Sequence, residues 1–173
     1  FNDSALNIAA EPGALVRYAR RLEVETGKES EHQKDRVTLL KDSGYVRWES
    51  HTAVVLMDVG EIGPSYLPGH AHADTLTFEM SLFQNRFVVD SGTSCYGMGE
   101  ERLYQRRTKA HNTVSIDDAD SSEVWGGFRV ARRAMPLNFF CEQSDKTVSI
   151  SCEHNGFCRL PGQVIHRRRW LLS

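Results

Sequence analysis

The sequence of 173 residues has no run of about 18 apolar residues, so we expect no helix in it to span a bilayer. It also has little net charge, because 21 Lys and Arg residues against 23 Asp and Glu residues leave a formal charge of -2 at pH 7. This balance gives no overall field that attracts nucleic acid or a membrane surface. We therefore expect no nucleic-acid partner and no membrane span.

Cysteine is scarce: the chain has Cys95, Cys141, Cys152 and Cys158, and no two of them are spaced as CxxC. Four irregularly spaced cysteines exclude a disulfide scaffold and argue against a structural zinc knuckle. Unpaired, buried thiols are the favoured interpretation, and a single bridge between Cys152 and Cys158 is the alternative. Cysteine usage therefore does not decide between an oxidising and a reducing compartment.

The two ends of the sequence lack the features of a complete chain. Phe1 and the residues after it contain neither an initiating Met nor the basic segment of a signal peptide. The stretch 163–173 reads as a strand that stops in mid-sheet. On these grounds we expect the sequence to be a piece of a longer protein.

The chain is long enough for one domain, and 40% of its residues are hydrophobic. One helix is predicted near the start, where Pro12 occupies an early helical position and apolar residues repeat at helical spacing from Ala14 to Leu22. A polar linker follows at 29–34. From Val37 onward, short alternating or apolar runs separated by turn signals predict strand after strand. We therefore predict an all-β fold, an antiparallel β-sandwich, preceded by a short N-terminal helix.

Several strands are specified closely. An alternating strand is expected at 45–48 and a buried central strand at 53–59. The stretches 75–82 and 87–90 are predicted to form a hairpin around a turn at 83–86. Residues 91–110 form a long polar excursion, of a kind that is usually functional or mobile. Further strands are predicted at 111–117, 137–141, 146–152 and 164–172.

The histidines of the stretch Gly69-His70-Ala71-His72-Ala73-Asp74 are two residues apart. On an extended segment, both imidazoles then point to the same side. Two imidazoles and a carboxylate from separate segments suit zinc, with one coordination position left open. We predict His72, Asp90 and His111 as the ligands, with His70 beside them for chemistry and Asp74 as a rival carboxylate.

Hairpin register alone does not bring these ligands together. With a four-residue turn at 83–86, Asp90 falls opposite about Glu79 and not opposite His72. A bend before Thr75 is needed to bring His72 to the site.

The polar excursion carries candidate substrate-binding residues. A guanidinium can bind a substrate carboxylate through two parallel hydrogen bonds. We take Arg106, Arg107 and Glu101 as candidates, with a salt-bridged surface loop as an equally weighted alternative. Tyr96 and Tyr104 are assigned to packing with an exposed hydroxyl in preference to acid–base chemistry, and Trp125 to core packing in preference to a wall for a sugar ring.

Four stretches in this order resemble the heparinase II/III-like family of polysaccharide lyases, over about Asp42 to Ala134. They are Gly69-His70-Ala71-His72-Ala73-Asp74, Val89-Asp90-Ser91-Gly92-Thr93, Ala110-His111-Asn112-Thr113-Val114 and Ser122-Glu123-Val124-Trp125-Gly126-Gly127-Phe128-Arg129-Val130. Members pair an N-terminal helical toroid with a C-terminal antiparallel β-sandwich. The resemblance makes residues 35–173 the sandwich, truncated at its C-terminus, and 1–34 the connector or last helix of an upstream helical domain on which it packs.

The resemblance also implies an activity. Such lyases cleave acidic polysaccharides by β-elimination across a 4-linked uronic acid and carry zinc on two His and one Asp. By motif these ligands are His72, Asp90 and His111, and the catalytic histidine is His70. Glycosaminoglycan, alginate and surface exopolysaccharide substrates all stay open. Because such enzymes are often exported by bacteria, a periplasmic or secreted location is expected.

The sequence also departs from the family pattern. Members take a catalytic tyrosine, and an asparagine or histidine, from the toroid, and nothing here matches those positions. We therefore expect this chain alone to be inactive. Two alternatives remain. One is a cupin-type metalloenzyme, for which Glu79 lies too far past His72; the other is a non-catalytic carbohydrate-binding or structural domain.

Overall fold

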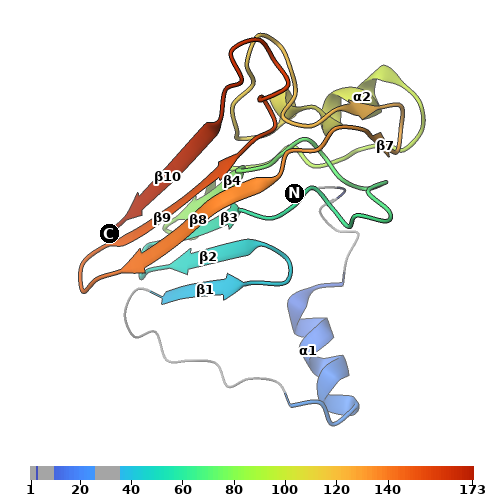
Figure 1. Ribbon diagram of the computed structural model, residues 1–173. Helices are drawn as coiled ribbons and strands as arrows, with labels where there is room; N and C mark the ends of the chain where they lie inside the picture. Colours follow the sequence, from blue (N-terminus) through green and yellow to red (C-terminus); the bar gives the residue numbers. More distant parts are fainter. Residues whose placement is uncertain (1–2, 4–9, 26–35) are drawn as a thin grey trace.

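The computed structural model describes Asp3, residues 10–25 and residues 36–173. Over these residues two antiparallel sheets lie on either side of one core (Figure 1). The larger sheet has the order β1-β2-β3-β4-β5 and the smaller β10-β9-β8, and β6 and β7 form a separate two-stranded ribbon. The strands are β1 (Arg36–Leu40), β2 (Tyr45–Glu49), β3 (Ala53–Asp58), β4 (Phe78–Leu82), β5 (Asn85–Val88), β6 (Val124–Trp125), β7 (Arg129–Val130), β8 (Pro136–Gln143), β9 (Val148–His154) and β10 (His166–Leu172). The predicted antiparallel β-sandwich is confirmed.

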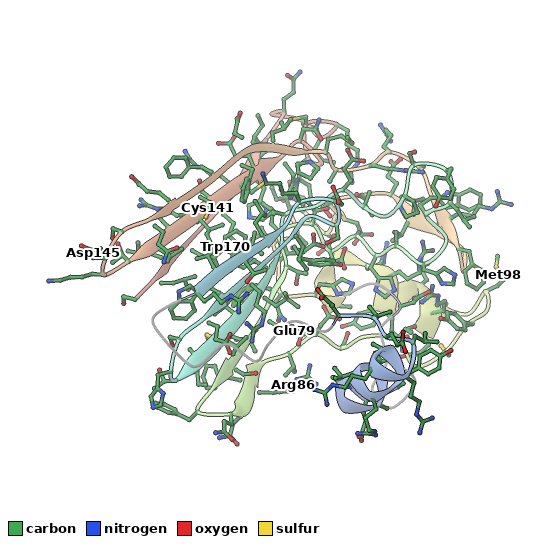
Figure 2. The ribbon with its side chains drawn as sticks, turned by 90° about the horizontal axis from the view of Figure 1, so that it is seen from below. Glu79, Arg86, Met98, Cys141, Asp145 and Trp170 are labelled. Atoms are coloured by element: carbon green, nitrogen blue, oxygen red, sulfur yellow. The ribbon has the colours of Figure 1, made fainter. Side chains whose placement is uncertain are left out.

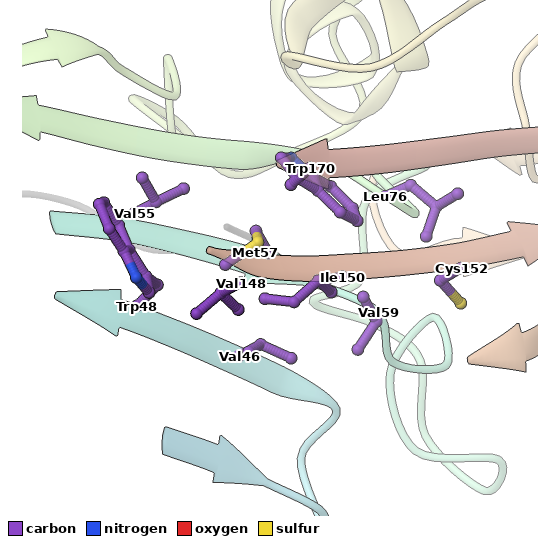
Figure 3. Close-up of a cluster of buried hydrophobic side chains, with 10 residues drawn as sticks. All are labelled: Val46, Trp48, Val55, Met57, Val59, Leu76, Val148, Ile150, Cys152 and Trp170. Carbon is purple, nitrogen blue, oxygen red and sulfur yellow. The ribbon is translucent and has the colours of Figure 1, made fainter. Parts of the chain in front are cut away.

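The core lies between the two sheets and follows the period of two that strands impose. In β2, Val46 and Trp48 are buried while their neighbours along the strand are half-buried. Each such side chain contributes about 1.5–3 kcal/mol to stability by leaving water. Figure 3 shows side chains of both sheets, together with two from the connection between β3 and β4, meeting in one cluster: Val46, Trp48, Val55, Met57, Val59, Leu76, Val148, Ile150, Cys152 and Trp170.

Helix α1 (Pro12–Arg21) confirms the predicted N-terminal helix, with Pro in its first turn. None of its residues is buried, and Leu15, Tyr18 and the C-cap residue Leu22 are all more than half exposed. In Figure 1 it lies apart from the sheets. Within the described residues, its apolar side chains are therefore not covered. No described helix is long and apolar enough to span a membrane. The predicted linker at 29–34 lies outside the described residues.

The polar excursion at 91–110 contains structure that the sequence did not predict. It holds helix α2 (Glu100–Arg106) and the short 3₁₀ helix η1 (Thr108–Ala110). The strand expected at 111–117 is wrong, because only an isolated bridge between Ile116 and Ala119 forms there. Instead, the Asn112 side-chain amide donates to the carbonyls of Phe78 at 3.1 Å and Val89 at 2.9 Å, which fixes this segment beside the β4–β5 hairpin.

That hairpin is tighter than expected. Its turn consists of Phe83 and Gln84, both with positive φ, as a two-residue turn between twisted strands requires. The bend that His72 needs is present slightly later in the chain than expected. Thr77 N–H donates to the Asp74 carbonyl at 2.8 Å, and Leu76 between them has a φ of 64°. A left-handed Leu costs about 1–2 kcal/mol, which burial of its side chain in the core offsets.

All four cysteines are unpaired, so the alternative bridge between Cys152 and Cys158 does not form. Burial is confirmed for Cys152, whereas Cys141 on β8 is exposed. The prediction that the thiols are unpaired is therefore confirmed, whereas the prediction that they are buried holds only in part.

A histidine pair joins the ends of β9 and β10. His154 is fully buried, and its Nδ1 accepts a hydrogen bond from Gly156 N–H at 3.1 Å. Its Nε2 then carries the proton and donates to Nδ1 of His166 at 3.0 Å. Burial, together with the charges of His166, Arg159 and Arg168, lowers the pKa of His154 to about 3. The ring is therefore neutral at physiological pH.

This pair predicts loss of stability in acid. An unfolded histidine has a pKa of about 6.5, so below that pH the unfolded chain binds a proton that the folded chain excludes. Above about pH 6.5 His154 does not change the free energy of unfolding. Below that pH the free energy of unfolding falls, by up to about 1.4 kcal/mol per pH unit, until about pH 3. Urea unfolding of the protein between pH 7.5 and 4.5 should show this slope. It should be shallower in His154→Asn and unchanged in His51→Asn, which alters an exposed histidine; equal slopes in all three would contradict the assignment.

Candidate functional site

The predicted site residues gather on loops at one end of the sandwich. Figure 2 shows Met98, in the loop before α2, at the opposite end of the molecule from Asp145, in the turn between β8 and β9. The segment 69–74, the excursion 91–110 with the flanking Asp90 and His111, and the β6–β7 ribbon all contribute to this end. They are joined by hydrogen bonds such as that from Ala73 N–H to the carbonyl of Arg106, at 2.8 Å.

His72, Asp90 and His111 come together there from three separate segments. The imidazole rings of His72 and His111 have centroids 5.1 Å apart. Nδ1 of His111 lies 2.7 Å from Oδ2 of Asp90, and Oδ1 of Asp90 accepts from Gly92 N–H at 2.8 Å. The side chains of all three are buried. The three predicted ligands are therefore neighbours, although nothing in their spacing alone required it.

The charge states of two of these residues suit a metal. Burial lowers the pKa of His72 to about 4, against the opposing effect of Asp3, so its imidazole is neutral and keeps a lone pair. Burial alone would raise the pKa of Asp90, but the hydrogen bond and charge of His111 outweigh it and bring the pKa to about 2. A neutral imidazole and an ionised carboxylate are the forms that ligate zinc.

The residue types fit zinc, and Nε2 of His111 is buried without a hydrogen-bond partner. Yet within the part of the chain that the structure describes, no three His, Cys, Asp or Glu side chains are arranged to hold a metal ion. One reason is that Nδ1 of His111 and Oδ2 of Asp90 point at each other and form a hydrogen bond. Coordination requires these two atoms to turn toward a shared ion.

The rival carboxylate Asp74 belongs to a different cluster. Burial and the neighbouring charge of Asp74 raise the pKa of Asp58 well above its usual value. Asp58 in turn accepts a hydrogen bond from Gly60 N–H at 2.9 Å. The acidic pair therefore lies at the end of β3, which favours Asp90 over Asp74 as the partner of His111.

His70 lies at the rim of the buried cluster, with 66% of its side chain exposed. Its Nδ1 is 2.7 Å from Oδ2 of Asp3. Its ring meets those of Tyr96 and Phe128 edge-on, with centroids 6.0 and 6.2 Å away. His70 is therefore the histidine of the pair that a ligand can reach.

Arg102 also belongs to the site, and sequence reasoning did not select it. Its guanidinium is 1% exposed, forms a salt bridge with Asp3, and donates to Thr93 Oγ1 at 2.9 Å and the Gly127 carbonyl at 3.1 Å. Arg102 and Arg106 are four residues apart and share one face of α2. This four-residue spacing would have pointed to Arg102 if helix α2 had been predicted from the sequence.

The three candidate substrate-binding residues have other contacts. Arg106 is fully buried and donates to the carbonyls of Ala71, Gly126 and Arg129, at 3.1, 3.2 and 3.2 Å. Arg107 pairs with Asp120 at 3.2 Å. Oε1 of Glu101 accepts from the Gln105 amide at 2.6 Å. These contacts favour structural roles for all three.

A groove of about 700 Å³ begins beside His70, and its lining includes Gly69, Trp125, Phe128 and Arg129. Trp125 is 54% exposed with Arg129 stacked 5.5 Å from its ring, so the core-packing interpretation of Trp125 is wrong. Position 127, in the same turn, must be a glycine, because a Cβ there would lie 2.0 Å from the Gly97 carbonyl oxygen. Trp125 therefore forms a wall that a sugar ring can stack on.

Comparison with protein families decides the relationship. The family model described as "Heparinase II/III-like, C-terminal" matches residues 32–173. The chain belongs to the heparinase II/III-like family. A comparison with curated proteins gave no match. The matched range begins close to the predicted start of the sandwich at residue 35.

Solved structures agree with the fold of this heparinase II/III-like domain. Heparinase III superposes with a TM-score of 0.69 at 18% identity, over 99% of this chain and 28% of that one. The heparan sulfate lyase HepC from Pedobacter heparinus gives a TM-score of 0.64 at 17% identity, over 92% of this chain and 25% of that one. The chain thus spans about a quarter of the length of these solved lyases.

Proposed function

We propose that this chain is the β-sandwich part of a polysaccharide lyase that cleaves a uronic-acid-containing acidic polysaccharide by β-elimination. The family relationship supports lyase chemistry at the family level. The single observation that carries the proposal is the exposed His70 beside Arg102, whose buried guanidinium binds a carboxylate. Together they offer a proton-transfer group next to a site for the acid group of a uronate.

In the proposed reaction a base removes the proton on the carbon beside the uronate carboxyl group. The electron pair forms a carbon–carbon double bond, the glycosidic bond breaks, and the leaving oxygen takes a proton. Neutralising the carboxylate stabilises the enolate-like charge that develops in the transition state. His70 fits the base or the charge-stabilising role, and a helical domain upstream supplies the remaining groups.

Packing on that helical domain has support in α1. Leu15, Tyr18 and Leu22 form an apolar stripe that the described sandwich does not cover. A helix with such a stripe is stable when the stripe packs against another element. We propose that the upstream domain provides this partner, with α1 as its connector.

The activity test compares the natural full-length protein with the isolated chain 1–173. Uronate polymers of the glycosaminoglycan and alginate classes are incubated with each, and the ultraviolet absorbance of the unsaturated product is followed. We expect turnover by the full-length protein and none by the isolated chain. Binding without turnover by the full-length protein would support the non-catalytic alternative, and strong turnover by the isolated chain would overturn the need for upstream groups.

We further propose that zinc is held by His72, Asp90 and His111. Because an imidazole has two ring nitrogens, the contact of His72 with Asp3 through Nε2 is compatible with coordination through Nδ1. A bound zinc would neutralise the buried Asp90 and hold the three segments together, as a structural metal does.

Metal analysis of the purified full-length protein tests the zinc site. We expect about one zinc per chain, and a melting temperature that falls by several degrees on chelation because the metal binds the folded state. His111→Ala should lose the zinc and the response to chelator, whereas His51→Ala should keep both. Absence of zinc together with unchanged melting after chelation would count against the site.

A further inference from the structure

A carboxylate from a distant segment occupies the rim of the site. Oδ2 of Asp3 lies 2.8 Å from Nη2 of Arg102 and 2.7 Å from Nδ1 of His70. Oδ1 accepts from Nη1 of Arg102 and lies 2.8 Å from Nε2 of His72. The guanidinium thus contacts both oxygens in parallel, which is the geometry in which arginine recognises carboxylates.

This site stabilises a negative charge. The Asp3 side chain is only 5% exposed, and its two oxygens face the guanidinium of Arg102 and one ring nitrogen each of His70 and His72. Of the residues that the structure describes, Asp3 provides the one carboxylate within salt-bridge distance of Arg102. A buried guanidinium without a partner is costly, so any state in which Asp3 leaves favours another anion in its place.

Arg102 and Arg106 differ in their hydrogen-bond partners, and the difference indicates anion recognition for Arg102 and a structural role for Arg106. The guanidinium of Arg106 donates hydrogen bonds to three backbone carbonyls of neighbouring loops, which is a structural role. Arg102 donates to one backbone carbonyl, that of Gly127, and to the Thr93 hydroxyl, and its two terminal nitrogens both contact Asp3. The end of its guanidinium therefore contacts a side chain that can be exchanged without breaking the loop framework.

The surroundings of the carboxylate suit a sugar ring. The guanidinium of Arg102 lies 5.1 Å from the ring centroid of Tyr96 and 5.4 Å from that of Phe128, and both aromatic residues are exposed. The groove lined by Trp125 and Phe128 continues from Gly69, next to His70. A pyranose can thus lie against aromatic faces with an acid substituent directed at Arg102.

We propose that Arg102, with His70 and His72, binds the carboxylate of a substrate uronate, and that Asp3 fills this site as an internal ligand until the uronate displaces it. The inference rests on the proposed function for its ligand class. It assigns Arg102 the role of carboxylate recognition, and it assigns Asp3 the role of an internal competitor for the same site.

The test measures binding, so that it does not depend on turnover. Titration of the full-length protein with methyl glucuronide and with methyl glucoside, which differ in the carboxylate, gives two dissociation constants. We expect the glucuronide to bind at least tenfold more tightly. Asp3→Asn should tighten glucuronide binding at least threefold because the internal competitor is weakened, whereas Asp118→Asn, at an exposed acid paired with Lys109, should not change it.

Arg102→Lys keeps the charge but loses the two-pronged geometry, and it should weaken glucuronide binding about tenfold while leaving glucoside binding unchanged. Equal binding of the two sugars, or glucuronide affinity that does not respond to Asp3→Asn, would overturn the inference. Loss of stability in Asp3→Asn without a change in affinity would make Asp3 a structural link only and would overturn it as well. If glucuronide binding follows these expectations but no uronate polymer is cleaved, the proposed function fails while the carboxylate site stands.

Discussion

The His70→Ala variant of the full-length protein is expected to lose about 10²- to 10⁴-fold in kcat on the uronate polymer proposed as its substrate, the range typical for removal of a positioned acid–base group. Because 66% of the His70 side chain is exposed and its contacts lie at the rim, the variant should keep its melting temperature within about 2 °C. Initial rates of unsaturated product formation and a thermal melt measure the two effects.

His51→Ala serves as the matched control, since His51 is also exposed but lies between β2 and β3, away from the site loops. Its kcat should stay within twofold of the wild type. If His70→Ala retained normal kcat and lost only affinity, His70 would be a carboxylate-binding residue without a part in proton transfer. The pH profile of kcat separates these cases, because loss of a proton-transfer group changes the profile whereas loss of a binding contact does not.

Arg106→Ala is expected to lower the free energy of unfolding by about 3–5 kcal/mol, since it leaves one buried and two partly buried carbonyls without their donor. Those carbonyls belong to Ala71, between the two site histidines, and to Gly126 and Arg129 of the β6–β7 ribbon. Urea denaturation measures the loss.

Arg107→Ala provides the comparison, because Arg107 is half exposed and its ion pair with Asp120 is worth at most about 1 kcal/mol. Unfolding of that variant should resemble the wild type. If Arg106 instead bound substrate, as the sequence suggested, its replacement would raise KM and leave the unfolding curve in place. The two variants together therefore test the sequence-based candidates against the structural roles that their contacts favour.

The strands were predictable where burial alternates along the chain. Val46 and Trp48 of β2, and the apolar run of β3, show the pattern directly. Helix α2 was missed because its buried residues are Arg102, Gln105 and Arg106, so that no apolar periodicity marks it. Hydropathy cannot signal an element that buries charged side chains against carbonyls and a carboxylate.

The site was predictable in its residue types and only partly in its geometry. His72, Asp90 and His111 were chosen as donors and lie together, but their meeting depends on a bend at Leu76. Leucine has no preference for positive φ, so burial of the side chain in the core determines this turn. The contribution of Asp3 was not foreseeable either, since no local pattern links it to residues 67 to 99 positions later.

The attachment of the β6–β7 ribbon has a consequence for which positions of this chain tolerate substitution. Arg106 secures the ribbon through the carbonyl groups of Gly126 and Arg129, which every amino acid possesses. Side chains at 125, 128 and 129 can therefore be exchanged without loosening the ribbon. The groove wall can thus change its side chains while the histidine segment, which the same arginine holds through the Ala71 carbonyl, stays in place.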